Sequence, residues 1–411
     1  MSPINSLVSP GKICGEFKST ESESANTEST DTAAGIIQMA PLSGNMVSLS
    51  ANAHSGESAE ALLVRLSGEA RRRRLTPVQA NAFCDPALGK QTGHSPSPAA
   101  LNPNAALAFP TAFLGRHDTP DGCVLGARVT AIPANSGHHW IFDEHGAVCG
   151  AKWETPDARY LLLGALTPAD TSAPRDRQAA AAWLLLQKRL ESAGFTLGNL
   201  VRTWFFNDHI LDWYADFNRV RNAFFNEHNI FGTLVPASTG VGACNAAGAA
   251  LSLDALAIAP KRKSSGGGMR IEAVASPLQC AAHDYKSAFS RAVECTSTQT
   301  PPATGGSRHL LVSGTASIGP DGKTAHAGDL DAQIDLSLRV VGAILKLRGM
   351  DWRDTSRAIL YFPKIEWMSR WEARREALGL PPIPGIFAHC DICRDDLLFE
   401  IEMDAWKEAA K

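Results

Sequence analysis

The chain has 411 residues, of which 44% are apolar and 20% charged, enough for a large core and two domains of ordinary size. Its 42 acidic residues slightly outnumber its 39 lysines and arginines, so composition favours neither nucleic acid nor anionic lipid as a partner. No stretch approaches the roughly 20 apolar residues that span a bilayer, and residues 1–60 lack the apolar core of a secretory signal. We therefore expect a cytoplasmic protein whose partner is a small molecule.

Residues 1–60 are rich in Ser, Thr, Asn, Gly and Ala and contain the polar run at 19–24. Such a composition buries little apolar surface, so we predict a disordered tail. Residues 61–104 show no defined pattern, and their basic run at 71–74 is typical of a solvated helix face. From about residue 105 short β-rich runs alternate with turns, so the ordered part is expected to begin there.

The segment from 159 to 259 predicts strands and amphipathic helices in alternation. A strand at 159–164 precedes a helix-periodic apolar run that Gln178 opens and Gly194 closes. A strand at 201–206, a second amphipathic helix through Trp213 and Phe225, and a closing strand at 249–259 follow.

A later segment repeats this order. Gln333 opens its first helix, Gly349 closes it, and Arg357 begins the strand that follows. These residues lie 155 positions after Gln178, Gly194 and Arg202, and three equal offsets indicate an internal duplication. The charged, Gly-rich stretch at 261–268 reads as a linker, so we predict domains at 105–262 and 263–411.

The second copy resembles the RidA (YjgF) family over about 100 residues. The strings that carry the resemblance are LLVSG at 310–314, DLDAQ at 329–333, AIL at 343–345 and LFEIE at 398–402. The resemblance implies an α/β (α+β) fold with two tandem units, each a mixed β-sheet with two helices on one face. RidA proteins form trimers with active sites between subunits, so a tandem copy offers such a cleft within one chain. The oligomeric state stays open between monomer and trimer.

RidA enamine deaminases carry a Pro-Ala-Arg motif whose Arg holds the substrate carboxylate. This sequence has Ser238 after Pro-Ala in the first copy and Ile386 after Pro-Gly in the second, which argues against deamination. Longer strings resemble the chorismatase family over residues 105–406 instead. They are SPLQ at 276–279, YKSAFSRA at 285–292, SGTASI at 313–318 and CRDDLLFE at 393–400.

The resemblance to chorismatases implies release of pyruvate from chorismate, with 3-hydroxybenzoate or a dihydroxycyclohexadiene carboxylate as the second product. That chemistry needs cations for two carboxylates and one acid that protonates the enolpyruvyl methylene, and it needs no metal or redox cofactor. A Glu in a desolvated cleft suits the acid role because burial raises its pKa.

We predict Glu400 as that acid. The repeat places Ser252 opposite Glu400 and Asp254 opposite Glu402, so only the second copy has the first carboxylate. Glu400 and Glu402 share a face of the presumed strand, which leaves Glu402 as the second candidate. Ion pairing at a sheet surface is the structural alternative for both.

The arginine fork suits a carboxylate, and the candidates are Arg202, Arg291, Arg374 and Arg375. Spacing does not choose between Arg374 and Arg375, and each is also typical of a solvated helix charge. Tyr285 is a possible hydroxyl donor.

Small residues complete the expected substrate site. Ala316 ends a strand where a ring can approach the backbone, and Cys393 precedes Glu400 by seven residues. The CxxC at 390–393 has no second pair at zinc spacing, so we expect no metal. Cys393 favours 3-hydroxybenzoate as product, whereas Ala316 favours the reverse. An enamine or imine deaminase and a RidA-like binding protein without turnover remain alternative functions.

Overall fold

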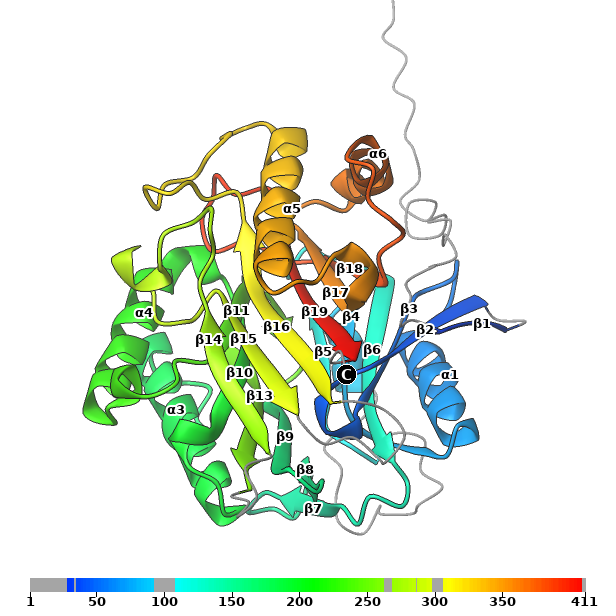
Figure 1. Ribbon diagram of the computed structural model, residues 1–411, viewed down its shortest axis with the longest axis vertical. Helices are drawn as coiled ribbons and strands as arrows, with labels where there is room; N and C mark the ends of the chain where they lie inside the picture. Colours follow the sequence, from blue (N-terminus) through cyan, green and yellow to red (C-terminus); the bar gives the residue numbers. More distant parts are fainter. Residues whose placement is uncertain are drawn as a thin grey trace, which may run out of the picture.

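The computed structural model describes residues 28–32, 35–91, 108–261, 268–285, 287–297 and 306–408. These residues form three mixed β-sheets, each with helices on its outer face (Figure 1). We call the sheets and their helices unit 1 (28–133), unit 2 (139–260) and unit 3 (269–408). No helix in these ranges has the length and apolar content needed to cross a bilayer.

Unit 1 comprises β1 (Glu28–Thr32), β2 (Gly35–Pro41), β3 (Val47–Asn52), α1 (Ala59–Arg72), β4 (Leu75–Cys84), α2 (Ala87–Gln91), β5 (Thr111–Gly115) and β6 (Val124–Pro133). Its sheet has the order β1-β2-β3-β6-β4-β5 and is extended by β12 (Cys244–Asn245).

Unit 2 comprises β7 (His139–Phe142), β8 (Val148–Glu154), β9 (Ala158–Leu166), α3 (Arg175–Ser192), β10 (Leu200–Asn207), α4 (Ile210–Glu227), β11 (Ala237–Gly242) and β13 (Leu251–Pro260). Unit 3 comprises β14 (Met269–Val274), β15 (Ala292–Ser297), β16 (Ser307–Ala316), α5 (Leu330–Leu347), β17 (Thr355–Phe362), α6 (Arg370–Ala377), β18 (Gly385–His389) and β19 (Glu400–Glu408).

The three units share one topology. The sheet orders β7-β8-β9-β13-β10-β11 and β14-β15-β16-β19-β17-β18 repeat that of unit 1 strand for strand. In each unit the last strand lies antiparallel between the third and fourth strands, and the fourth and fifth strands run parallel. The predicted pair of RidA-like units is confirmed, and the structure adds a third unit of the same plan.

The predicted equivalence of Gln178 and Gln333 is confirmed by their hydrogen bonds. Each is the fourth residue of its helix, and each amide oxygen accepts a 2.8 Å bond from a backbone N–H before or at the closing strand, from Ala250 and Leu398 respectively. Gly194 and Gly349 follow the two helix ends with φ values of +82° and +64°, a conformation that glycine adopts without a steric cost.

Because side chains alternate between the two faces of each strand, both faces of each sheet are apolar, and the described residues form four hydrophobic cores. The inner faces of all three sheets share a central core that includes Phe83, Phe206 and Tyr361, one from each unit. The outer faces pack separately against α1, against α3 and α4, and against α5 and α6. Figure 1 shows these helices on the periphery and the strands toward the middle of the molecule.

The prediction of a disordered tail over residues 1–60 is wrong for the residues that form β1 to β3 and the start of α1. Ile37 and Leu49 are almost fully buried in the core under α1. The polar composition misled the prediction because Ser48 and Ser50 are also buried, on the other face of β3. β5 and β6 lie in the sheet of unit 1, so the repeated unit that follows begins near residue 139 and not at 105. Residues 262–267, where the second predicted boundary falls, lie outside the described residues.

Candidate active site

A cavity lies between units 2 and 3, beside β11, β16 and the first residue of β19. It is lined by Tyr214, Arg221, Ser238, Gly240, Phe289, Arg291, Gly314, Ala316, Ile318, Cys393, Arg394 and Glu400. An isolated bridge between Ala237 and Ser290 joins the two units at this place. The cavity has a volume of about 40 Å³.

Glu400 is held against the backbone of the neighbouring strand. It pairs with Ala316 of β16 and with Tyr361 of β17, and it is 5% exposed. A Cβ at position 314 would lie 2.0 Å from its Oε1 atom, so the carboxyl group occupies the space that Gly314 leaves by having no side chain. Gly314 therefore lets the acid lie flat against the sheet at the cavity wall.

Two carboxyl groups two residues apart have opposite protonation preferences. Burial and the negative charge of Glu402 raise the pKa of Glu400 to about 8, against the weaker opposing effect of Arg202 and Arg291. Burial also raises the pKa of Glu402, but the charges of Arg357, Arg202 and Arg128 outweigh it and lower that pKa to about 2. Glu400 thus holds a proton at neutral pH and Glu402 does not, the separation expected when one of two carboxylates is a general acid.

Glu402 is fully occupied in a buried polar cluster. Its carboxylate accepts hydrogen bonds from Arg202 Nη2 at 3.0 Å, from Trp204 Nε1 at 2.9 Å and from Arg357 Nη1 at 2.7 Å. Arg202 and Glu402 have no exposed side-chain surface. Glu402 is therefore a fixed negative charge behind Glu400, and it has neither the proton nor the access for acid catalysis.

The strand registers bear out the equivalence of Ser252 and Glu400. Phe206 pairs with Ser252 in unit 2, and Tyr361, 155 residues later, pairs with Glu400 in unit 3. In unit 1 the same position on the last strand is Gly126, which pairs with Phe83. Of the three equivalent positions, one alone carries a carboxyl group.

The structure places Arg202 beside the cavity and not in it. Its guanidinium donates to Thr239 Oγ1 at 2.7 Å and to Glu402, and it lies 5.1 Å from the centre of the Trp204 ring. Arg202 therefore acts on Glu400 through its charge, and only its Nη2 atom is hydrogen-bonded within the described residues.

Arg291, a candidate substrate ligand from the sequence, lines the cavity. Its Nε and Nη2 atoms donate to the Cys280 carbonyl oxygen at 3.0 and 2.8 Å, which fixes the side chain, and its guanidinium lies 5.5 Å from the Phe289 ring centre. It is the one predicted arginine that reaches both the cavity and the acid.

Arg374 and Arg375 are placed elsewhere, which corrects their assignment as substrate ligands. Arg374 forms ion pairs with Asp335 of α5, and Arg375 bonds Glu372 and the Leu380 carbonyl. Both side chains hold α6 against its surroundings, because the face of α6 that carries them turns toward α5 and the following loop.

Two arginines that sequence reasoning missed line the cavity instead. Arg221 comes from α4 and is 3% exposed, packed 6.0 Å from the Phe289 ring centre. Arg394 follows Cys393 in the loop before β19. Arg394 stood within the chorismatase-like string CRDDLLFE, which was a usable signal. Arg221 gave none, because α4 reaches the cavity only through packing of unit 2 on unit 3.

Ala316 and Cys393, both candidate substrate-site residues from the sequence, line the cavity. Burial and the nearby charge of Glu400 raise the pKa of the Cys393 thiol to about 12, so it is neutral there. Tyr214 of α4 also lines the cavity and lies 3.5 Å from Ser287 through its hydroxyl. The side chain of Tyr285 lies outside the described residues.

Fold and cavity together define a class of protein, in which RidA-like units repeat within one chain and a cleft between two of them carries an acid and arginines. No family model matches the chain. It is 28% identical to a 3-hydroxybenzoate synthase of Streptomyces hygroscopicus over 287 residues, which is 64% of this chain and 79% of that protein. A chorismatase of the same organism is 27% identical over 278 residues, 63% of this chain and 75% of the relative.

A crystal structure of a chorismatase has the same fold, with a TM-score of 0.55 over 80% of this chain and 92% of that one, at 19% identity. The resemblance to chorismatases that the sequence strings indicated is supported by these comparisons.

Proposed function

We propose that this protein is a chorismatase that releases pyruvate from chorismate, with Glu400 as the proton donor. The observation that carries the proposal is a buried carboxyl group, protonated near neutral pH, at the wall of a cavity that three arginines line. Similarity to proteins named chorismatase and 3-hydroxybenzoate synthase supports chorismate as the substrate.

Arg221, Arg291 and Arg394 are the proposed ligands of the two substrate carboxylates. A guanidinium presents paired donors that match a carboxylate, and its strength increases where water is excluded. Burial of Arg221 and the carbonyl contacts of Arg291 hold both groups in place before substrate arrives. The enolpyruvyl group then faces Glu400.

Catalysis begins with transfer of the Glu400 proton to the enolpyruvyl methylene carbon. The ether carbon becomes an electrophilic oxocarbenium centre, and the carboxylate left on Glu400 faces it. In the hydrolytic route water adds to this centre and the ether C–O bond on the pyruvyl side breaks, giving pyruvate and a dihydroxycyclohexadiene carboxylate. In the intramolecular route no water is consumed: the ring hydroxyl oxygen bonds to the ether-bearing ring carbon as that carbon's bond to the ether oxygen breaks, and the ether oxygen leaves as the keto oxygen of pyruvate. Net loss of one proton restores the proton of Glu400, and the ring rearranges to 3-hydroxybenzoate without any change in oxidation state.

We favour 3-hydroxybenzoate because Cys393 lies on the cavity wall with a neutral thiol. Its apolar sulfur occupies space beside Glu400 and disfavours a water molecule there. Ala316, on the same wall, leaves room on the other side and favours the hydrolytic product. The ratio of the two products is the direct measure of which residue dominates.

Incubation with chorismate tests the proposal, with pyruvate followed through lactate dehydrogenase and the ring product identified by mass spectrometry. Glu400→Gln keeps the shape and removes the transferable proton, so pyruvate release should fall by about 100- to 10,000-fold. Glu408→Gln is the matched control, because Glu408 is exposed at the far end of β19.

Other outcomes would assign the alternatives. Ammonia release from an enamine or imine without pyruvate release from chorismate indicates a deaminase. Chorismate binding without turnover by the wild-type chain indicates a binding protein. Near wild-type turnover by Glu400→Gln contradicts the assignment of the acid.

A further inference from the structure

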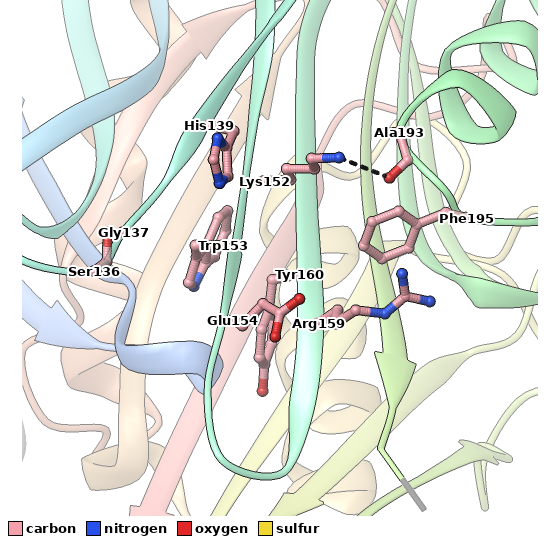
Figure 2. A pocket seen from close by; sticks show the side chains of 10 residues that line it. All are labelled: Ser136, Gly137, His139, Lys152, Trp153, Glu154, Arg159, Tyr160, Ala193 and Phe195. Atoms are coloured by element: carbon pink, nitrogen blue, oxygen red, sulfur yellow. Dashed lines mark hydrogen bonds between the residues drawn. The ribbon is translucent and has the colours of Figure 1, made fainter.

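A second cavity lies in unit 2, between the end of β8, the start of β9 and the end of α3. It has a volume of about 290 Å³ and shares no lining residue with the cavity at Glu400. We call it the β8–α3 pocket and define it by His139, Lys152, Glu154, Arg159, Ala193 and Phe195. Figure 2 shows Lys152 reaching toward Ala193 and the Arg159 guanidinium beside the Phe195 ring.

The pocket has an excess of positive charge. Lys152 donates a 3.3 Å hydrogen bond to the Ala193 carbonyl, and the Arg159 guanidinium lies 5.1 Å from the centre of the Phe195 ring. Neither forms a salt bridge within the part of the chain that the structure describes. The carboxylate of Glu154 lies on the rim and binds Lys261 at 2.7 Å. Three cations therefore surround one carboxylate.

In unit 3 the position equivalent to the β8–α3 pocket is occupied by a carboxylate of the protein itself, Glu294. The strand pairings establish this equivalence. Arg159 pairs with Ala259, which lies five residues after Asp254 on its strand. Arg308 pairs with Lys407, which lies five residues after Glu402 on its strand. Because Asp254 and Glu402 are equivalent positions, Arg159 and Arg308 are equivalent as well.

From this pair the two neighbouring strands follow in register. Glu154 pairs with Arg159 and Thr296 pairs with Arg308, so Glu154 and Thr296 occupy equivalent positions. Two residues earlier on the same strands, Lys152 is therefore equivalent to Glu294. The helix offset of 155 makes Ala193 equivalent to Arg348.

The unit 3 equivalent is closed by ion pairs. Glu294 is fully buried and binds both Arg308 and Arg348, and Arg348 also binds Glu272. In unit 2 a lysine replaces that glutamate and an alanine replaces Arg348. The space is left open, and Lys152, not a carboxylate, stands at the position that Glu294 holds in unit 3.

We propose that the β8–α3 pocket binds a small aromatic monocarboxylate, whose carboxylate group takes the place that Glu294 holds in unit 3 and lies between Lys152 and Arg159. The proposal concerns a site separate from Glu400 and does not rest on the proposed function.

The walls define the rest of the ligand. The volume is at the lower end of the range for ligand pockets, which suits one six-membered ring. The Phe195 and His139 rings offer aromatic surface to it. Glu154 on the rim disfavours a second negative charge, so a dicarboxylate or a phosphate ester fits less well.

Calorimetric titration of the full chain with benzoate tests the site, with benzyl alcohol as the uncharged comparison. Benzoate should bind and benzyl alcohol should not. Arg159→Gln should weaken benzoate binding by about 10- to 100-fold, the effect of losing a charge-assisted hydrogen bond. The double substitution Lys152→Glu with Ala193→Arg rebuilds the unit 3 ion pairs and should abolish binding. Lys188→Gln is the control, because Lys188 is exposed on α3 and pairs with Glu144 outside the pocket.

Three results would overturn the proposal. They are no benzoate binding at millimolar concentration, equal binding of benzyl alcohol, and benzoate binding that survives the double substitution but is lost in Arg291→Gln, which would place benzoate in the other cavity. If the double variant does not fold by circular dichroism, Arg159→Gln decides alone, and unchanged affinity in that variant refutes the site.

Discussion

Replacing Glu400 by Gln should make the protein more stable, by an amount that grows with pH. The pKa of Glu400 is about 8 in the folded chain against a reference value of 4.5. Between these values the folded chain holds a proton that the unfolded chain releases, so ionisation of Glu400 favours unfolding increasingly as pH rises. Gln removes this effect because it does not titrate.

The magnitude follows from the width of that window. Above pH 4.5 the free energy of unfolding of the wild type falls by about 1.4 kcal/mol per pH unit, until Glu400 also ionises in the folded chain near pH 8. The variant should therefore match the wild type near pH 4.5 and exceed it by on the order of 3 kcal/mol at pH 7. For a chain of this length that difference raises the melting temperature by roughly 3–4 °C.

Thermal unfolding of both proteins across pH 4.5 to 8, followed by tryptophan fluorescence, measures the difference. Glu402→Gln is the opposite control, because its lowered pKa stabilises the fold above pH 4.5 and its loss leaves Arg202 and Arg357 without their carboxylate. That variant should be less stable at pH 7 by about 3–5 kcal/mol. A melting difference between wild type and Glu400→Gln that is constant with pH, or that favours the wild type at pH 7, would refute the raised pKa.

Five further outcomes are expected. Pyruvate release should decline as pH rises through about 8, because the general acid must be protonated. Gly314→Ala should reduce pyruvate release by about 100-fold and shift the pH at which release declines, because the new methyl group displaces the Glu400 carboxyl group. Arg291→Gln should lower kcat/KM by about 10- to 100-fold, whereas Arg374→Gln should change it less than twofold in the same assay. Cys393→Ala should shift the product ratio, measured by mass spectrometry, from 3-hydroxybenzoate toward the diol. Deletion of residues 1–52 should abolish soluble expression, because β2 and β3 cover the core of unit 1; a folded, active product would contradict this assignment.

The third unit adds a third position equivalent to Glu400. In a closed arrangement of three equivalent units, β5 contacts β9, β11 contacts β16, and β18 contacts β3, so each unit meets the next in the same way. The equivalent positions on the last strands are Gly126, Ser252 and Glu400. Two of the three have no carboxyl group, and the arginines of the cavity lie at the third, Glu400.

The sequence by itself predicted the repeat, singled out Glu400 as the candidate acid and indicated the resemblance to chorismatases. Equal offsets between Gln178 and Gln333 reported a duplicated pattern of helix starts, because the same helix must bury the same face in each copy. The choice of Glu400 over Ser252 also came from the sequence, since a repeat aligns residues without knowledge of their contacts.

The tertiary structure alone decided the rest. Unit 1 escaped prediction because its strands bury serines and other small residues on one face, so its composition resembles that of a disordered segment. Arg221 reached the cavity and Arg374 did not, because the packing of one unit on another selects which helix faces meet. The different protonation of Glu400 and Glu402 likewise required the structure, because only the contacts show that Glu402 is hydrogen-bonded to Arg202 and Arg357.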